Sequence, residues 1–201
     1  MNSKLIAIAG GTGAGKSTLC MALQDKYPDQ VGLIQLDDYF KPPAEKPKLD
    51  GMENSDHPDA LYLDKLARDL VDLKEGRSVV VNTKSERSNP NYKETGKRIP
   101  ITVLPKPIIL VEGFLVLWDE RIRKLLEFSI YLDVAHDTRW ERRVHFKMPG
   151  YEENVLIPMH NQYVEPTKQY ANMVIDVSSM QSRNVSSQVE DLLRQQGLLS
   201  R

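Results

Sequence analysis

Residues 10–17 read GGTGAGKS, which matches the phosphate-binding pattern G-x-x-x-x-G-K-[ST]. Such a loop points its backbone N–H groups at an anion from a helix N-terminus, where unpaired donors and the helix dipole both favour negative charge. Lys16 is expected to reach the β- and γ-phosphates of a nucleotide, and the Ser17 hydroxyl to bind Mg²⁺. The residues expected to bind the phosphates are Gly11, Thr12, Gly13, Ala14, Gly15, Lys16, Ser17 and Thr18.

Carboxylates follow two further apolar runs of the sequence. Asp37 and Asp38 come directly after residues 31–36, and Glu112 follows residues 108–111. At the C-terminal end of a strand in an open α/β sheet, such a side chain faces the ligand crevice. Asp37 would there accept the proton of an attacking hydroxyl, and Glu112 would help to hold Mg²⁺. The alternatives are an acidic pair that only solvates its loop and a plain acid at a strand end.

The elements that must position these residues alternate between short apolar runs and helical patterns, which indicates a parallel sheet covered on both faces. Strands are expected at residues 5–9, 31–36, 108–111, 128–134 and 173–177. Helices are expected at 16–26, from 61 to Gly76, from a capping box of Thr138 and Glu141 to about 147, at 152–164, and along Val185, Val189, Leu192 and Leu193. The predicted class is α/β, a three-layer α/β/α P-loop NTPase fold with a mostly parallel central sheet and a short lid.

The chain is expected to form one P-loop domain over residues 1–201. Residues 41–59 are rich in proline and charge and predict a loop. Two apolar runs flank a polar stretch at 78–104, which predicts a hairpin-like excursion on the acceptor side. Pro149 and Gly150 suggest a hinge for a lid near 143–152.

Composition restricts the partners without identifying the substrate. A net charge of −1 and a pI of about 6.4 give no electrostatic footprint for nucleic acid or an anionic membrane. Cys20 is the only cysteine, so the chain holds no internal disulfide, as suits a reducing compartment. No apolar run approaches roughly 18 residues, and none resembles a signal peptide. We expect a cytoplasmic protein with a small-molecule substrate, no nucleic acid and no membrane partner, and leave a homo-oligomer open.

A phosphate-binding loop is shared by kinases, GTPases and motor ATPases. A GTPase would need an N-K-x-D motif to read its base, and the nearest match, NTKS at 82–85, fails. Six segments instead occur in an order that resembles the uridine kinase and phosphoribulokinase family. These are GGTGAGKST (10–18), LDDYFKP (36–42), DHPDA (56–60), ILVEG (109–113), DTRWERR (137–143) and PTKQYA (166–171). The resemblance implies a nucleoside kinase that moves the γ-phosphate of ATP to a ribose 5′-hydroxyl, that of uridine or cytidine above all, with Mg²⁺.

The resemblance also implies roles for individual residues. Asp37 matches the catalytic base, and Asp56 matches a carboxylate that binds the ribose 2′- and 3′-hydroxyls. Arg143 matches an arginine near the ribose and the transferred phosphate, and Gln162 a glutamine that reads the base. Asp56 could instead cap a helix whose first turn contains Pro58, a role that does not exclude sugar binding.

Three arginines share one face of a predicted helix. Arg139, Arg142 and Arg143 stand at i, i+3 and i+4, so their guanidinium groups lie together. Beside the suggested hinge, they predict a lid that closes on the triphosphate, with Arg139 among the nucleotide-binding residues. The alternative is a set of exposed ion pairs.

The chain departs from the family where the base would bind. Uridine kinases carry a Tyr-Asp-Phe and a His-Ser-Arg after the third strand, whereas residues 81–87 read VNTKSER. Tyr39 and Phe40, beside Asp37, are therefore the candidates for stacking on a base. The segment KMPGY at 147–151 is similar to nicotinamide riboside kinases. The acceptor could thus be nicotinamide riboside, pantothenate or another small alcohol. A regulatory ATP-binding protein with a degenerate acceptor pocket is a further alternative, and a degenerate pocket has no reason to keep both Asp37 and Asp56.

Overall fold

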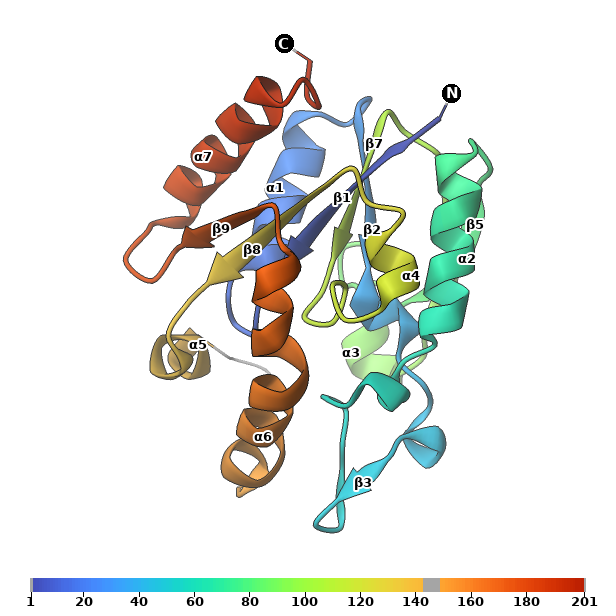
Figure 1. The fold of residues 1–201 in the computed structure, drawn as a ribbon. Coiled ribbons are helices and arrows are strands. Elements are labelled where there is room, and N and C mark those ends of the chain that lie inside the picture. Colours follow the sequence, from blue (N-terminus) through green and yellow to red (C-terminus); the bar gives the residue numbers. More distant parts are fainter. Residues whose placement is uncertain (1, 143–148, 201) are drawn as a thin grey trace.

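The centre of the protein is a five-stranded sheet in which every neighbouring pair of strands is parallel. The structure is a computed structural model and describes residues 2–142 and 149–200 (Figure 1). Across the sheet lie β2 (Val31–Gln35), β7 (Ile108–Glu112), β1 (Lys4–Ala9), β8 (Phe128–Asp133) and β9 (Met173–Asp176), in that order. The predicted α/β class and parallel central sheet are confirmed.

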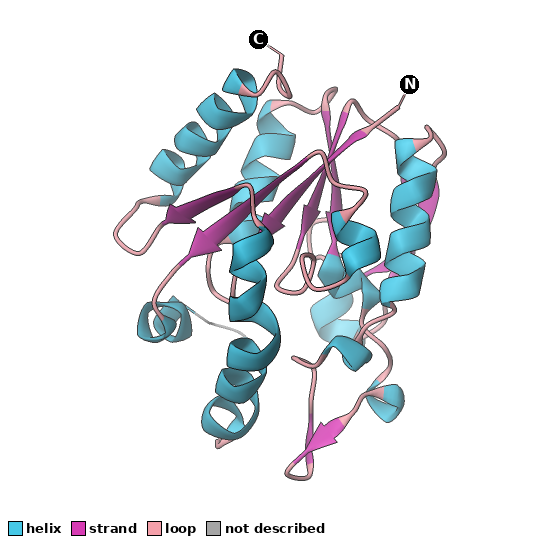
Figure 2. Ribbon diagram, in the orientation of Figure 1, coloured by secondary structure: helices cyan, strands magenta, loops and turns pink. Residues whose placement is uncertain are grey.

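Helices cover both faces of this sheet, because the central strand β1 is apolar on both sides. Successive side chains of a strand point to opposite faces. Leu5 and Ala7 pack in a core that includes side chains of α2, whereas Ile6 and Ile8 pack in a second core with side chains of α1 and α7. Helices α1 and α7 accordingly lie on one side of the sheet and α2 on the other (Figure 2). The result is a three-layer arrangement.

The helices on these two faces largely follow the predicted pattern. They are α1 (Lys16–Lys26), α2 (Leu63–Lys74), α4 (Glu120–Arg123) and α7 (Ser182–Gln195). Helix α1 has the predicted bounds, and α2 begins two residues after the predicted start at 61. The predicted apolar face of α7 is buried: Val185, Val189, Leu192 and Leu193. In the part of the chain that the structure describes, no helix is long and apolar enough to span a bilayer.

The predicted excursion at 78–104 is an antiparallel hairpin that forms a sheet of its own. Strand β5 (Val79–Thr83) pairs with β6 (Ile99–Val103), and the short helix α3 (Tyr92–Thr95) lies between them. The predicted loop at 41–59 contains a second, smaller hairpin of β3 (Lys48–Leu49) and β4 (Met52–Glu53). Short 3-10 turns, Pro43–Glu45 and Pro58–Ala60, flank this hairpin.

Helix α5 (His136–Arg142) begins earlier than predicted. Its first turn follows β8 directly, since the Arg139 N–H donates to the Ala135 carbonyl over 3.1 Å. Thr138 is therefore the third residue of the helix and not its cap, so the predicted capping box is wrong. The predicted end near residue 147, and the part of the predicted lid at 143–148, lie outside the described residues.

Residues 152–170 are helical throughout, but their turns are not uniform. Two π-helical turns, Glu152–Leu156 and His160–Val164, enclose α6 (Ile157–Met159), and a 3-10 segment, Glu165–Tyr170, follows. Pro158 has no N–H to donate, so a regular α-helical ladder cannot run through it. The predicted helix at 152–164 exists, in a widened form.

Candidate active site

The phosphate-binding loop joins β1 to α1 and carries a buried lysine. The Lys16 side chain folds back under the loop, and its Nζ donates to the Gly11 carbonyl over 2.9 Å. Burial lowers the pKa of the Lys16 ammonium, while the nearby carboxylates of Glu112 and Asp37 act in the opposite direction. The loop thus holds a cation next to its backbone N–H groups, as a phosphate site requires.

Two glycines of this loop are needed because α5 approaches it closely. A Cβ on Gly11 would overlap the Arg139 guanidinium, and a Cβ on Gly13, whose φ is 79°, would overlap the Arg139 backbone carbonyl. Arg139 is only 3% exposed, so the alternative of an exposed ion pair does not apply to it. Its guanidinium donates to the Val134 carbonyl over 3.0 Å and contacts the Thr12 carbonyl at 3.5 Å. The arginine therefore lies against the phosphate-binding loop.

His160 contacts the Arg139 guanidinium, and the sequence did not predict it as a site residue. Its Nε2 lies 3.1 Å from Nη2 of Arg139. Burial, followed by the charge of Arg139, lowers the pKa of His160 to about 4 from its ordinary 6.5. The imidazole is therefore neutral at neutral pH and accepts a hydrogen bond from the arginine. The sequence signal was weak, since a lone histidine in a helix is usually a structural residue.

Ser17, Gln35 and Glu112 form a small polar group at the ends of α1, β2 and β7. Oε1 of Glu112 accepts hydrogen bonds from Ser17 Oγ over 2.9 Å and from Gln35 Nε2 over 3.1 Å. Parallel register sets Gln35 beside Glu112. Burial raises the pKa of the Glu112 carboxyl, and the Lys16 ammonium opposes this shift.

The predicted Mg²⁺ ligands thus lie together. Among the described residues, no group of three or more His, Cys, Asp or Glu side chains forms a ready metal site. Ser17 and Glu112 supply two oxygen donors, which suits Mg²⁺, because this ion is commonly held by one or two carboxylates with waters and substrate phosphates.

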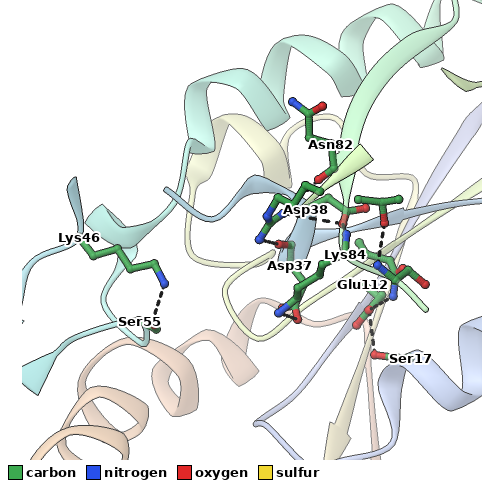
Figure 3. A network of polar contacts seen from close by, with 12 residues as sticks. Ser17, Asp37, Asp38, Lys46, Ser55, Asn82, Lys84 and Glu112 are labelled. Atoms are coloured by element: carbon green, nitrogen blue, oxygen red, sulfur yellow. Dashed lines mark hydrogen bonds and ion pairs between the residues drawn. The ribbon is translucent and has the colours of Figure 1, made fainter. Parts of the chain in front are cut away.

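Asp37 and Asp38 are neighbours in sequence but have opposite environments. Both belong to a 3-10 turn, Leu36–Tyr39, at the end of β2. The Asp37 side chain is 47% exposed, and its Oδ2 pairs with Nζ of Lys84 at 2.8 Å. The Asp38 side chain is only 5% exposed; it accepts the Lys84 N–H over 3.3 Å, and burial raises its pKa. The Asp37 side chain is therefore much the more exposed of the two, and Figure 3 shows both aspartates close to Lys84.

Lys84 and Arg98 of the β5–β6 hairpin hold this acidic turn. In addition to the Lys84 pair, Nη2 of Arg98 donates to the Asp37 carbonyl over 3.0 Å, and Nη1 of Arg98 donates to the Asn82 carbonyl over 3.1 Å. Sequence reasoning missed both cations. The predicted pairing of the two strands was the only signal, and it does not reveal which loop the hairpin will contact.

Asp56 is a buried carboxylate that also lines a large cavity. It is 8% exposed, and its Oδ2 accepts a hydrogen bond from the Tyr151 hydroxyl over 2.7 Å. Its own N–H donates to Asn54 Oδ1 over 3.2 Å. The alternative role as a helix cap is wrong, because His57 caps the 3-10 turn Pro58–Ala60. The predicted proline in the first turn is present.

The two aromatic candidates also differ. Tyr39 is 2% exposed, and its hydroxyl donates to Asp69 over 2.7 Å, so its ring is part of the core. Phe40 is half-buried, with Nζ of Lys46 at 4.9 Å and Nζ of Lys84 at 5.5 Å from its ring centre. Phe40 therefore offers more accessible ring surface than Tyr39. Stacking on a base stays a prediction for both.

One large cavity, of about 2320 Å³, connects these groups. Its wall includes the loop from Gly13 to Thr18, together with Asp37, Phe40, Asp56, Lys84, Glu112, Arg142 and Tyr151. Gln162 is exposed and donates to the Tyr163 hydroxyl over 3.0 Å, and it does not belong to this wall within the described part of the chain. Arg143 lies outside the described residues, so its predicted roles stay predictions.

The chain is similar to known proteins of one family. The model of the "Phosphoribulokinase / Uridine kinase family" matches residues 5–184. A uridine kinase of Brevibacillus brevis is 34% identical over 192 residues, which cover 87% of this chain and 85% of the relative. A uridine kinase of Clostridium botulinum is 37% identical over 187 residues, which cover 85% of this chain and 86% of the relative.

Solved structures share the fold. A possible uridine kinase from Bacillus stearothermophilus superposes with a TM-score of 0.63 at 18% identity, over 88% of this chain and 90% of that chain. Shikimate kinase from Acinetobacter baumannii superposes with a TM-score of 0.54 at 14% identity, over 98% of this chain and 96% of that chain. The chain belongs to the phosphoribulokinase and uridine kinase family and is a kinase that transfers phosphate to a hydroxyl acceptor.

Proposed function

We propose that this kinase transfers the γ-phosphate of ATP to the 5′-hydroxyl of a ribonucleoside of the uridine and cytidine class. The observation that carries the proposal is the single cavity whose wall holds the phosphate-binding loop, Asp37 and Asp56. A phosphate donor and a sugar acceptor can therefore occupy the same space. The names of the relatives support a pyrimidine nucleoside as acceptor.

Asp37 is the proposed general base. Its carboxylate lines the cavity and is close enough to Lys16 and Glu112 to affect both of their pKa values. A base here would accept the proton of the acceptor hydroxyl as that oxygen attacks the γ-phosphate. Lys84 would orient the carboxylate, and the buried Asp38 side chain, which accepts the Lys84 N–H, would hold the turn.

The loop residues 11–18 and Lys16 are the proposed binding site for the phosphates of ATP. Arg139 would support this loop from behind, because its guanidinium contacts the Thr12 carbonyl. Ser17 and Glu112 are the proposed residues that hold Mg²⁺. When bound, the ion would offset negative charge on the phosphates. The predicted contribution of Arg143 to charge stabilisation is kept as part of the proposal.

Asp56 is the proposed binding group for the ribose 2′- and 3′-hydroxyls. It is a buried carboxylate on the cavity wall, and a carboxylate accepts hydrogen bonds from two neighbouring hydroxyls. The combination of Asp37 and Asp56 on one wall also argues against a purely regulatory nucleotide-binding protein, which needs neither. A cytoplasmic location and a homo-oligomer stay predictions.

The proposal is tested by measuring ADP release with ATP, Mg²⁺ and a panel of acceptors. Uridine and cytidine are expected to be phosphorylated faster than nicotinamide riboside, pantothenate or shikimate. ADP release with no acceptor at all sets the background. If only an alcohol without a ribose supports ADP release above this background, the nucleoside assignment is wrong.

A further inference from the structure

We call the part of the cavity wall that contains Asp37 and Asp56 the proposed acceptor half. It contains a buried hydrogen bond between residues far apart in the sequence. The Tyr151 hydroxyl donates to Oδ2 of Asp56 over 2.7 Å, and both side chains line the cavity. Tyr151 is 2% exposed and Asp56 is 8% exposed. Solvent therefore competes little for this bond, and it holds the carboxylate in one orientation.

Packing fixes the tyrosine ring. Tyr151 forms a small apolar cluster with Val155, Leu156 and Met159 of the helical segment that follows it, and Met52 packs against this cluster. The position of the hydroxyl is thus set by the ring and not by the hydrogen bond alone.

Asp56, the acceptor of this hydrogen bond, is connected to the same helical segment through Asn54. Asn54 Oδ1 accepts the Asp56 N–H over 3.2 Å, while Asn54 Nδ2 lies 3.2 Å from Sδ of Met159. Among the described residues, Asp56 and Tyr151 are thus linked directly by their hydrogen bond and indirectly through Asn54 and Met159. These links fix the relative positions of the two side chains more firmly than one contact at the surface would.

We infer that Tyr151 is a positioning residue for the acceptor, which acts by orienting Asp56 towards the sugar hydroxyls. A phenol hydroxyl suits this role because it is neutral: it donates one hydrogen bond to the carboxylate without adding a positive charge beside it. A carboxylate has about four lone-pair sites, so one hydrogen bond from a phenol does not exhaust its general capacity to accept from hydroxyls. The inference rests on the proposed function, since it assigns the specificity of the same site.

The test compares wild type with Tyr151→Phe, which removes the hydroxyl and keeps the ring in its cluster. We expect KM for uridine to rise by roughly 10-fold, the value of one hydrogen bond to a charged group, with a smaller change in kcat and in KM for ATP. The ratio of kcat/KM for uridine to that for 2′-deoxyuridine is expected to fall. Because both values come from one preparation, this ratio is insensitive to a loss of folded protein.

Tyr27→Phe is the matched control. The Tyr27 hydroxyl also bonds a carboxylate, that of Glu190, but it does so beside α7, and Tyr27 is not among the described residues that line the cavity. This variant is expected to leave both KM values and the ribose preference unchanged. An equal effect of the two substitutions would show that Tyr151→Phe acts through general stability.

A double-mutant cycle with Asp56→Asn tests whether Tyr151 acts through Asp56. If it does, adding Tyr151→Phe to Asp56→Asn causes little further rise in KM for the acceptor, because the orienting role is already lost. Full additivity of the two effects, or an unchanged ribose preference in Tyr151→Phe, would overturn the inference. Failure of wild type to phosphorylate any ribonucleoside would instead overturn the proposed function.

Discussion

The proposed phosphate half and the proposed acceptor half of the cavity are built in different ways. The phosphate half is mainly one contiguous segment, residues 11–18, whose geometry is set by backbone turns and glycines. The acceptor half brings together Asp37, Asp56, Lys84 and Tyr151, which come from four separate segments and are held by side-chain contacts. Backbone geometry is encoded locally, whereas contacts between distant segments depend on the whole fold. The first half can therefore be recognised from a short sequence motif, whereas the second half becomes visible only in the tertiary structure.

The largest expected effect is on the phosphate half. Lys16→Ala is expected to abolish phosphoryl transfer, a loss of roughly 10³-fold or more, because the buried ammonium is the cation beside the loop that would bind the phosphates. Lys26→Ala, on the exposed side of the same helix, is the control and keeps its activity. Near-normal turnover of Lys16→Ala with a normal melting curve would contradict the assignment of the phosphate half.

A second, smaller effect separates the two neighbouring aspartates. Asp37→Asn keeps the size of the side chain but cannot accept a proton, so kcat is expected to fall by about 10²-fold while ATP affinity changes little. Asp38→Asn is the matched control and is expected to lower kcat much less, since the Asp38 side chain is only 5% exposed and accepts the Lys84 N–H. Equal rates for the two variants, measured at saturating substrates, would remove Asp37 from the role of base.

A third prediction concerns the sugar. If Asp56 binds the ribose diol, a 2′-deoxynucleoside leaves one hydrogen bond to a buried carboxylate unmade, which costs about 1.5–3 kcal/mol, or roughly 10- to 150-fold in kcat/KM. Residues 81–87 supply neither an aromatic ring nor a histidine, so the preference between uridine and cytidine is expected to be smaller. Deoxyuridine that reacts as fast as uridine would remove Asp56 from the ribose site.

The last effect is on stability and not on activity, and it belongs to His160, which contacts Arg139. The pKa of His160 is about 4 in the folded protein and near 6.5 when it is solvated. Between these pH values the unfolded chain binds a proton that the folded chain does not, so the free energy of unfolding decreases as the pH falls from 6.5 to 4.

His160→Gln keeps an acceptor for Arg139 but cannot be protonated, so the variant lacks this part of the pH dependence. The difference between the two proteins across this range is expected to be of the order of 2 to 3 kcal/mol, measured by chemical denaturation at several pH values. Parallel pH profiles for wild type and His160→Gln would contradict the burial of a neutral histidine.

The sequence predicted the parts of the molecule whose signals are local. Apolar runs located the strands, Gly and Lys at fixed spacing located the phosphate loop, and two runs around a polar stretch predicted the β5–β6 hairpin. The start of α5 was predicted wrongly. The helix already begins at His136, shortly after β8, so Thr138, which resembles a cap, lies inside the helix.

The acceptor half was only partly predictable, since its residues are defined by their partners. Asp37 and Tyr39 lie two positions apart, yet the 3-10 turn directs one side chain into the cavity and the other into the core. Lys84 and Tyr151 have ordinary positions in the sequence, and only the tertiary structure brings them to the two carboxylates. The sequence thus singled out both carboxylates as candidates but not the side chains that contact them.

The most direct test of the account is to identify the product. Wild-type protein is incubated with ATP, Mg²⁺ and uridine, and the position of the new phosphate ester is determined by ³¹P NMR with proton coupling. We expect a phosphate on the 5′-hydroxyl, and about 10²-fold slower formation of this product by Asp37→Asn. A phosphate on the 2′- or 3′-hydroxyl, or no phosphorylated nucleoside in the wild-type reaction, would contradict it.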